Sequence, residues 1–416
     1  MKPQRQISVG IFSAPAVRMH FLQAVTCAGC RYEGRCEARW QAGKILFDGQ
    51  LRDEWVFTPV ATPAEGFSPA TFDLSDVVIG VDFHWQRKEV QRFAGALKLI
   101  VEGERITAVN LIGIEDYLRS VISSEMKATA SPEFLKAHAV ISRSWLLAQI
   151  ERRGKAPVGR PEFVETEDTL IRWADREDHL HFDVCADDHC QRYQGLSRLR
   201  ATRADEAVLA TWGQVLTLDG VLCDTRFSKC CGGMTERFST CWENRDYPYL
   251  APVADRPADG GPDFCDTADE AVLSQVLNDY DLETKDFYRW RVAYDRHALA
   301  ELIRRRSGID FGDEIRALEP LERGASGRIW LLRIVGSQRT MTVGKELTIR
   351  RWLSESHLKS SAFEVSQEGD RLVLTGRGWG HGVGLCQIGA AVMGHRCYPY
   401  TAILAHYFPG SELSVR

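Results

Sequence analysis

The residue with the clearest chemical potential in this sequence is a glutamate that ends an apolar stripe. Ile114, Leu118, Val121 and Ile122 have the i, i+4, i+7, i+8 spacing of one helix face. Continuing this helix at 3.6 residues per turn places Glu125 on the same face. Because burial disfavours the charged form of a carboxylate, we expect a raised pKa for Glu125. A carboxylic acid that stays protonated near neutral pH can donate a proton to a glycosidic oxygen.

Two alternatives concern this carboxylate and its neighbours. The helix can also end at Ser123 and Ser124, in which case Glu125 lies in water like most charged side chains. Glu115 and Asp116 fall off the apolar stripe, so we predict surface or helix-capping positions for them. No second acid stands at an obvious spacing from Glu125, so a mechanism with two carboxylates has no clear candidate.

A second group of chemically active side chains is the segment HLHFDVCADDHC at residues 179–190. In an extended strand, His179, His181 and Cys185 point to the same side, and Cys190 follows closely. Two thiolates and an imidazole are suitable tetrahedral zinc ligands. The spacing is not that of a standard zinc finger, so structural thiols are the alternative. Structural thiols are also the alternative for Cys27 and Cys30, which form a lone CxxC pair, and for Cys36 nearby.

The loop Ser228–Glu236 contains two consecutive glycines, Gly232 and Gly233, and ends near Thr235. Paired glycines let backbone N–H groups approach a ligand closely. The alternative is an ordinary hairpin turn without a ligand.

The segment GRGWGHGVGLCQIGA at residues 376–390 places Trp379, His381 and Gln387 among glycines. No Lys-Ser/Thr pair follows these glycines, so the segment is not a phosphate loop. We predict that Trp379 stacks on a sugar ring, and that His381 and Gln387 hydrogen-bond the substrate or orient Glu125. A tight turn that buries the Trp and the His without a ligand is the alternative. Cys386 also lies in this segment. We do not predict it to be a nucleophile, because no residue at a suitable spacing could act as its base.

Lys136 and Arg143 stand one heptad apart on a predicted helix and therefore share a face. This face can bind a carboxylate group of a ligand. The alternative is a solvated basic edge.

The composition of the 416 residues excludes several classes of protein. The net charge of −5 gives no basic footprint, so nucleic acid is not an expected partner. No apolar run of about 18 residues is present, so we expect no membrane span. The N-terminal residues lack the apolar stretch of a signal peptide, and the sequence leaves the localisation unknown. Twelve cysteines form clusters without an even disulfide framework.

The elements that position these side chains follow from periodicity and capping signals. Short alternating runs up to residue 110 predict strands, including Ile7–Phe12 and Leu97–Val109. Ser131 with Pro132 predicts the start of a helix that ends near Arg152. Further predicted elements are a polar surface insertion at 158–188, short strands at 205–252, helices at 270–281, 297–307 and 400–407, and strands at 329–348.

Antiparallel-looking strands with segregated helices indicate an α+β fold, and the length of the chain indicates two lobes, which we expect to enclose a cleft. We predict four parts: a β-rich extension at 1–84, a lobe at 85–252 that contains Glu125 and a His/Cys insertion at about 155–195, a connector at 253–269, and a second lobe with the Gly-rich segment at 270–416.

Three segments in the right order resemble one protein family. NLIGIEDYLRSVISSEM with LKAHAVISRSW resembles the core signature of the stage II sporulation protein D / LytB amidase-enhancer family. FSKCCGGMTE resembles its Ser-x-x-(Cys/Ser)-Gly-Gly-x-Thr loop, and GRGWGHGVGLCQIGAAVMG with HYFPGSEL resembles its C-terminal signature. The resemblance covers roughly residues 85–411, and the first stretch with its three cysteines has no matching signature.

The resemblance implies a lytic transglycosylase that cuts peptidoglycan glycan strands lacking their stem peptides. It implies that Glu125 acts as the single acid/base and forms a 1,6-anhydro ring on N-acetylmuramic acid. It also implies that the Gly-Gly loop lies beside the acid, where Ser228 and Thr235 bind sugar groups. The mechanism requires no cofactor, although some family members hold zinc with one His and two Cys, which His179, Cys185 and Cys190 fit best.

Two rival functions remain open at this stage. The first is a non-catalytic amidase enhancer, which presents glycan strands to a separate cell-wall amidase. The second is a zinc hydrolase that uses the 179–190 cluster with an open position for water. A peptidoglycan substrate would imply the cell wall or periplasm as the location.

Overall fold

The computed structural model describes residues 4–60, 66–79, 87–127, 130–152, 164–173, 179–187, 190–197, 202–277 and 286–416. These residues form two compact units. The N-terminal unit consists of Met1–Ala128 with Asp178–Trp212, and the C-terminal unit consists of Thr129–Glu177 with Gly213–Arg416. Among the described helices, none has the length and apolar character needed to cross a membrane.

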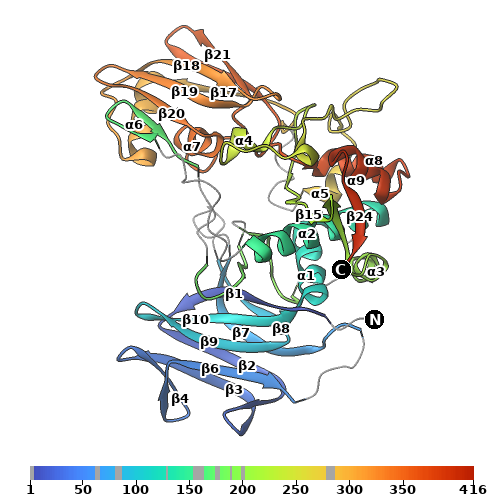
Figure 1. The fold of residues 1–416 in the computed structure, drawn as a ribbon. Coiled ribbons are helices and arrows are strands. Elements are labelled where there is room, and N and C mark those ends of the chain that lie inside the picture. The colour runs from blue at the N-terminus through green and yellow to red at the C-terminus, as the bar shows by residue number, and fades with distance from the viewer. Residues whose placement is uncertain are drawn as a thin grey trace. The chain divides into compact units, whose positions relative to one another are not determined.

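The N-terminal unit contains an 11-stranded sheet, seen at the blue end of the colour scale in Figure 1. Its main path runs in the order β13-β1-β10-β9-β6-β2-β3-β4-β5, while β7 pairs with β2 and β8. The strands are β1 (Gln6–Ala14), β2 (Ala16–Cys27), β3 (Cys30–Gln41), β4 (Lys44–Phe47), β5 (Gln50–Arg52), β6 (Glu54–Pro59), β7 (Ala70–Ile79), β8 (Arg87–Ala94), β9 (Ala96–Glu102), β10 (Arg105–Gly113) and β13 (Val184–Cys185).

Two helices belong to the same unit, α1 (Ile114–Glu125) and α3 (Thr202–Ala210). Helix α1 follows β10 directly and packs against both β10 and α3. Its buried side chains include Tyr117, Leu118, Val121 and Ile122, so the predicted apolar stripe faces the interior of the unit. Glu125 is the last residue of the helix.

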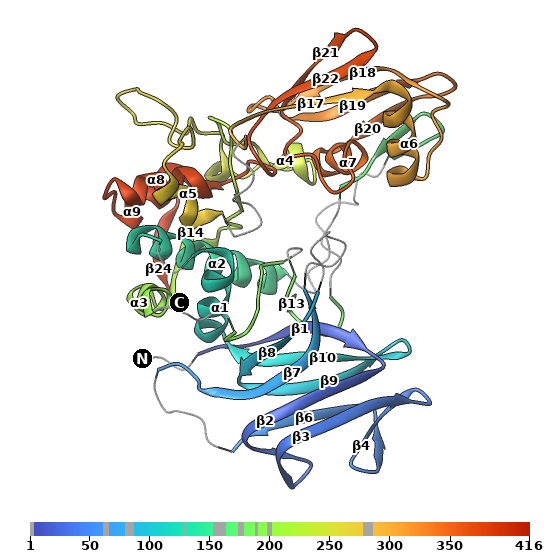
Figure 2. The ribbon, with the colours of Figure 1, turned by 180° about the vertical axis from the view of Figure 1, so that it is seen from behind.

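The C-terminal unit combines four small sheets with helices, as Figure 2 shows from behind. The sheets have the orders β11-β12-β20-β19-β18, β15-β14-β24, β16-β23 and β17-β22-β21. Their strands are β11 (Val164–Glu165), β12 (Thr169–Ile171), β14 (Gln214–Leu218), β15 (Val221–Leu222), β16 (Phe227–Ser228), β17 (Arg289–Asp295), β18 (Ile315–Arg323), β19 (Ile329–Gly336), β20 (Thr340–Gly344), β21 (Phe363–Glu368), β22 (Arg371–Arg377), β23 (Leu385–Cys386) and β24 (Glu412–Val415).

The helices of this unit form two groups. Helices α2, α5, α8 and α9 pack together, while α6 and α7 pack against strands β17 to β20 (Figure 1). The described helices are α2 (Pro132–Arg152), α4 (Phe238–Cys241), α5 (Glu270–Val276), α6 (Arg296–Ser307), α7 (Glu346–Trp352), α8 (Gln387–His395) and α9 (Tyr400–Tyr407), with a 3-10 turn at Pro248–Leu250.

Local signals explain where several of these helices begin and end. The Ser131 hydroxyl accepts a hydrogen bond from the Phe134 N–H at 3.3 Å, which caps α2 as predicted. Asp295 caps α6 in the same way, and Gly308 ends α6 in the left-handed conformation. Helix α2 is buried on nearly all sides, so it is a central helix of the unit instead of a helix with one inner face.

The structure confirms a mixture of helices with mostly antiparallel sheets, and a cleft between two lobes stays a prediction. Strands β1, β9 and β10 and helices α1, α2, α6 and α9 confirm the predicted elements. The strands expected at 205–252 and 329–348 are wrong in part, because 205–210 belongs to α3 and 346–348 begins α7. Helix α8 was not predicted.

The compact units differ from the predicted parts with boundaries at 84, 252 and 269. The first strands share one sheet with β8 to β10, so no separate extension ends at 84. The expected insertion at 158–188 is divided, because β11 and β12 join the sheet of β18 to β20 while β13 pairs with β1. Residues 158–163, 174–178 and 188 of that insertion lie outside the described residues.

Candidate functional site

Glu125 is half-buried at the C-terminal end of α1. Its carboxylate accepts a hydrogen bond from the backbone N–H of Arg192 at 3.2 Å. The predicted alternative, in which the helix ends at Ser123 and Ser124, is therefore wrong: the helix reaches Glu125, and the side chain contacts the protein. The Oγ of Ser124 is buried beside it and has no hydrogen-bond partner among the described residues.

The segment 190–197 runs along α1 and places the Arg192 N–H at Glu125. The Ser120 hydroxyl accepts from the Gln194 N–H at 3.1 Å, and the rings of Tyr117 and Tyr193 stack at 5.1 Å. Tyr193 in turn donates to Asn110 on β10 at 2.6 Å. Contacts from α1, from β10 and from the segment 190–197 therefore surround the carboxylate.

Glu115 and Asp116 are buried, so the surface position predicted for them is wrong. The Asp116 carboxylate accepts from the Ser68 N–H at 2.9 Å, and the Glu115 N–H donates to the Gln4 side chain at 3.1 Å. These contacts attach the first turn of α1 to the N-terminal residues. Asp116 therefore has a structural role at the start of α1, whereas Glu125 lies at the other end of the helix.

The three predicted metal ligands His179, Cys185 and Cys190 lie together in the N-terminal unit. Their ligand atoms are all within 4.8 Å of one another, and the Cys190 Sγ lies 3.5 Å from the His179 Nε2. The Cys185 N–H points at the Cys190 Sγ at 3.5 Å. Only Val184–Cys185 is a strand, so the expected extended strand through His181 is wrong, and His181 is exposed.

The strand β13 anchors this cluster to the sheet of the N-terminal unit. Val184 pairs with Val9 of β1, and the Asp183 carboxylate accepts from the Ser8 hydroxyl at 2.7 Å. The cluster also lies close to α1: burial, followed by the charges of Cys190 and Cys185, raises the pKa of Tyr117 well above its usual range. The cluster of His179, Cys185 and Cys190 therefore lies near helix α1.

The other predicted site residues belong to the C-terminal unit, where the Gly-Gly loop and the Gly-rich segment pair with each other. Strands β16 and β23 are parallel neighbours, Cys230 bridges to Trp379, and Glu236 bridges to Val383. Glycine is required at the contact, because a Cβ on Gly232 would lie 2.9 Å from the backbone nitrogen of Gly378. Two segments about 150 residues apart in the sequence therefore form one substructure.

The hydroxyls of the Gly-Gly loop differ in their surroundings. Thr235 is buried, and its hydroxyl accepts a hydrogen bond from the Val253 N–H at 2.8 Å. This bond attaches the Gly-Gly loop to the start of the 253–269 connector. The Ser228 Oγ is buried and has no hydrogen-bond partner within the described parts of the chain. A buried hydroxyl without a partner is unusual, which makes Ser228 the better candidate for contact with a ligand.

His381 is fixed at both ring nitrogens. Its Nδ1 accepts from the Val383 N–H at 3.0 Å, and the ring also hydrogen-bonds the backbone of Phe227. Desolvation, followed by nearby arginines, lowers its pKa to about 3. A neutral ring held by two backbone contacts fits a role in shaping the loop. Trp379, two residues earlier, is half-buried.

Gln387 is buried and contacts His138 of α2, with its Nε2 3.3 Å from the His138 Nε2. The other nitrogen of His138 lies 3.2 Å from the Ser142 Oγ. Gln387 therefore joins α8 to α2 and is positioned within the interior.

Lys136 and Arg143 do not share an exposed face. Arg143 is buried, and its guanidinium donates to the Gln214 carbonyl at 2.9 Å. Lys136 is partly exposed, and its Nζ lies 2.7 Å from the Glu133 carboxylate. Of the two, Lys136 is the one presented toward solvent.

Burial lowers the pKa of His138 from 6.5 to about 3, which predicts acid sensitivity. Between these values the unfolded chain binds a proton that the folded chain does not, so stability falls as pH falls below about 6.5. From pH 7 to pH 5 we expect a loss of about 2 kcal/mol from this histidine. Urea unfolding of wild type and His138→Asn at both pH values measures it. An unchanged pH difference in the variant would contradict this prediction.

Two buried charged residues near these loops were not singled out by the sequence. The Arg328 guanidinium donates to the Gly380 carbonyl at 3.0 Å and to the Cys231 carbonyl at 3.1 Å. The Glu236 carboxylate accepts from the Ser326 hydroxyl at 2.6 Å and from two backbone N–H groups of the 325–326 turn. An arginine before a predicted strand gives no signal of burial, so only the structure identifies it.

Comparisons with known proteins add to this geometry. The sequence model described as "Stage II sporulation protein" matches residues 102–218, and one described as a domain of unknown function (DUF8618) matches residues 236–384. Stage II sporulation protein D of Bacillus amyloliquefaciens is 23% identical over 307 residues, covering 74% of this chain and 76% of the relative. The protein of the same name from Bacillus subtilis (strain 168) is 23% identical over 308 residues, with the same coverage.

The chain is thus similar to stage II sporulation protein D along most of its length, and residues 102–218 match the family model. A further relative, the amidase enhancer of Bacillus subtilis (strain 168), is 24% identical over 326 residues, which cover 71% of this chain and 40% of the relative. The family match at 102–218 contains Glu125, helix α2 and the His179, Cys185 and Cys190 cluster. The Gly-Gly loop at 228–236 and the Gly-rich segment at 376–390 of this chain lie beyond that match.

Proposed function

We propose that this protein is a peptidoglycan lytic transglycosylase that acts on denuded glycan strands, with Glu125 as the acid/base. The observation that carries the proposal is the carboxylate itself: it ends a buried helical stripe and is held by the Arg192 N–H. A general acid/base has to be positioned within hydrogen-bond reach of the atom that it protonates, and the Arg192 N–H helps to position this carboxylate. The family relationship supports a function at the cell wall.

The proposed reaction uses one carboxyl group twice. Glu125 first donates its proton to the oxygen between N-acetylmuramic acid and N-acetylglucosamine, and the bond from that oxygen to C1 breaks. The C6 hydroxyl of the muramoyl residue then attacks C1, and its proton returns to the Glu125 carboxylate. The products are a 1,6-anhydro end and a free N-acetylglucosamine end. No water is consumed, so no second carboxylate is needed to activate one.

The C-terminal unit supplies candidates for binding the glycan. The Ser228 hydroxyl, which has no hydrogen-bond partner among the residues that the structure describes, suits a sugar hydroxyl. The half-buried ring of Trp379 suits a sugar face, and the partly exposed ammonium of Lys136 suits a carboxylate. The other predicted binding residues of this unit then have a structural role, because they make contacts within the protein. They are Gly232, Gly233, Thr235, His381, Gln387 and Arg143.

Mass spectrometry of soluble products tests the proposal directly. The purified full chain is incubated with denuded glycan strands and, in parallel, with peptide-bearing strands. We expect anhydro-muramyl oligosaccharides from the denuded strands. Products with reducing muramic acid ends would instead indicate hydrolysis and overturn the transglycosylase assignment.

A zinc ion fits the cluster in the N-terminal unit. His179, Cys185 and Cys190 offer one imidazole nitrogen and two sulfurs within 4.8 Å of one another, which is a suitable donor set for zinc. Zinc would cross-link Cys185 of β13 to His179 before the strand and to Cys190 after it. We expect Cys190→Ser to lower the zinc content by about one equivalent, measured by elemental analysis of the purified chain. Unchanged zinc content in this variant would rule out the cluster.

The amidase enhancer is the second candidate function, favoured by the similarity to the relative of that name. In this case the protein binds glycan strands and stimulates a cell-wall amidase without cutting them. Co-sedimentation with denuded and peptide-bearing strands, together with amidase assays in the presence of the protein, distinguishes the two functions. Stimulation without anhydro products would favour the enhancer.

A further inference from the structure

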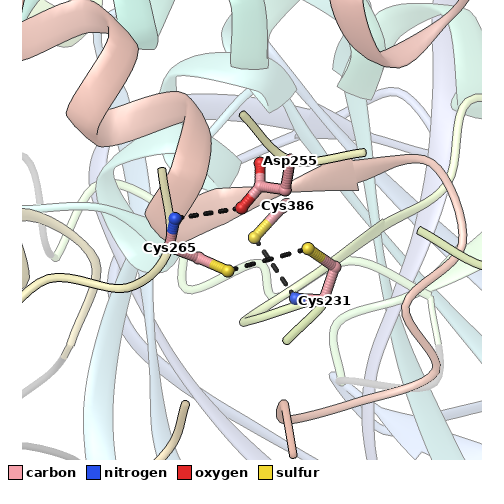
Figure 3. A group of neighbouring side chains, drawn as sticks. All are labelled: Cys231, Asp255, Cys265 and Cys386. Carbon is pink, nitrogen blue, oxygen red and sulfur yellow. Dashed lines mark hydrogen bonds between the residues drawn. The ribbon is translucent and has the colours of Figure 1, made fainter. Parts of the chain in front are cut away.

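Four buried side chains from distant parts of the sequence converge at one point in the C-terminal unit (Figure 3). Cys231 comes from the Gly-Gly loop, Asp255 and Cys265 from the 253–269 connector, and Cys386 from β23. Each is almost completely buried. Their sulfur atoms and a carboxylate oxygen all lie within 4.8 Å of one another. Neither the proposed reaction nor the family resemblance gives these residues a role.

The distances within this cluster match a bound metal ion better than a disulfide. The Sγ atoms of Cys231 and Cys265 are 3.7 Å apart. Two sulfurs on a tetrahedral zinc, each at about 2.3 Å from the ion, are about 3.8 Å apart. A disulfide would need about 2.0 Å. The separation of these two sulfurs is therefore that of two ligands on one zinc ion.

Backbone groups orient two of the ligand atoms as they do around metal centres. The Cys386 Sγ accepts from the Cys231 N–H at 3.2 Å, and the Asp255 Oδ2 accepts from the Cys265 N–H at 2.9 Å (Figure 3). The other carboxylate oxygen, Oδ1, accepts from the Tyr407 hydroxyl at 2.5 Å. Such outer hydrogen bonds fix the direction of ligands and support their charged forms.

The backbone around the carboxylate leaves no spare space. A Cβ on Gly389 would lie 2.4 Å from the Asp255 Oδ1 and 2.3 Å from the Tyr407 hydroxyl oxygen. The first turn of α8 therefore has to carry glycine there for the carboxylate to keep its place. A carboxylate buried this deeply is costly unless a cation or strong hydrogen bonds offset its charge.

We propose that Cys231, Cys265, Cys386 and Asp255 bind a structural zinc ion. Sulfur ligands select a soft or borderline metal, and four protein ligands leave no open position for water. Binding releases the protons of the three thiols to solvent. The ion joins the Gly-Gly loop, the connector and the Gly-rich segment, and so fixes the region that contains Ser228 and Trp379. Whether zinc binds here does not depend on whether the chain cuts glycan.

Cys230 is the nearest competitor for the fourth position. Its side chain interacts with those of Cys265 and Cys386 and is also buried. We assign the position to Asp255 because its oxygen lies within the four-ligand set, whereas the Cys230 sulfur does not.

The first test measures metal and thiols in the full chain purified under reducing conditions without chelator. It uses the Cys190→Ser background, which removes the cluster of the N-terminal unit from the count. We expect about one zinc per chain, together with protection of Cys231, Cys265 and Cys386 from alkylation until a chelator is added. Cobalt substitution should give the intense visible bands of a tetrahedral thiolate site. A metal-free chain with freely alkylated thiols, or a Cys231–Cys265 disulfide, would overturn the proposal.

The second test assigns the ligands by substitution in the same background. Cys386→Ser should lose the zinc, while Cys223→Ser, a matched change at a buried cysteine outside the cluster, should keep it. Asp255→Asn should weaken zinc binding at least tenfold in a chelator titration, while Cys230→Ser should not. Loss of zinc in Cys230→Ser with full binding in Asp255→Asn would overturn the assignment of Asp255. These outcomes are independent of whether the chain cuts glycan.

Discussion

Glu125→Gln is expected to abolish release of anhydro-muramyl products from denuded glycan strands while leaving the fold and glycan binding intact. The amide has nearly the same size as the carboxylic acid and can keep the contact with the Arg192 N–H. It can neither donate the proton that the glycosidic oxygen needs nor accept the proton of the C6 hydroxyl. Because both steps depend on this one group, we expect a rate loss of at least about 10²–10⁴-fold. Quantitative mass spectrometry of the products over time measures it.

Glu104→Gln is the matched control, because Glu104 is an exposed glutamate of the same unit, in the turn between β9 and β10. It should cut glycan at the wild-type rate. Undiminished release of anhydro products by Glu125→Gln would refute the catalytic role of Glu125. If the folded wild type binds glycan and releases nothing, the transglycosylase proposal fails and the amidase-enhancer function is favoured. A chain that neither cuts nor binds either kind of strand would exclude both.

The parts of this fold that the sequence predicts are those with local causes. The stripe from Ile114 to Ile122 gives the helix and its face without any distant contact, and Ser131 with Pro132 marks the next helix start. These two signals were enough to place Glu125 at the end of a buried face. The same reasoning fails for Glu115 and Asp116, because their burial depends on the N-terminal residues and on Ser68.

Helix α8 was missed because its glycines indicate a loop. Gly389 and Gly394 lower helix propensity, and their presence is explained only by what lies beside them in space. A Cβ on Gly389 would meet Asp255 and Tyr407, and one on Gly394 would meet Ser131 and Phe134. Close packing at these two positions outweighs the propensity cost, and no sequence pattern shows that packing.

Candidate site residues could be predicted as single positions but not as an assembly. The structure brings His179, Cys185 and Cys190 together, and the family resemblance, not their spacing, selected this set from the five His and Cys residues at 179–190. Cys231 and Cys386 are 155 residues apart, and no spacing rule connects them. Arg143 looked like a binding group from its helical position, yet the central location of α2 buries it.

Arg328→Met is expected to cause the largest loss of stability among single changes near the candidate binding loops. Arg328 is 0% exposed, and its guanidinium donates to the carbonyls of Cys230, Cys231 and Gly380 and to the Ser326 hydroxyl. Methionine keeps the apolar stem but removes every donor, so the buried carbonyls of Cys231 and Gly380 lose the guanidinium as a partner. The Cys230 carbonyl keeps its bond from the Trp379 N–H, and the Ser326 hydroxyl keeps its bond to Glu236. At about 1–3 kcal/mol for each unsatisfied group, with partial relaxation, we expect a loss of about 3–5 kcal/mol. Urea unfolding followed by circular dichroism measures it.

The segments that become less protected in Arg328→Met distinguish the loss of these hydrogen bonds from a general loss of packing. Arg333→Met is the matched control, because Arg333 lies on β19 shortly after Arg328 and forms an exposed ion pair with Glu319. It should change stability by less than about 1 kcal/mol. In Arg328→Met, hydrogen exchange should accelerate first in peptides covering 226–236 and 376–389, because the guanidinium joins these two segments. Equal stability of the two variants, or faster exchange confined to β19, would show that the buried guanidinium does not hold the loops together.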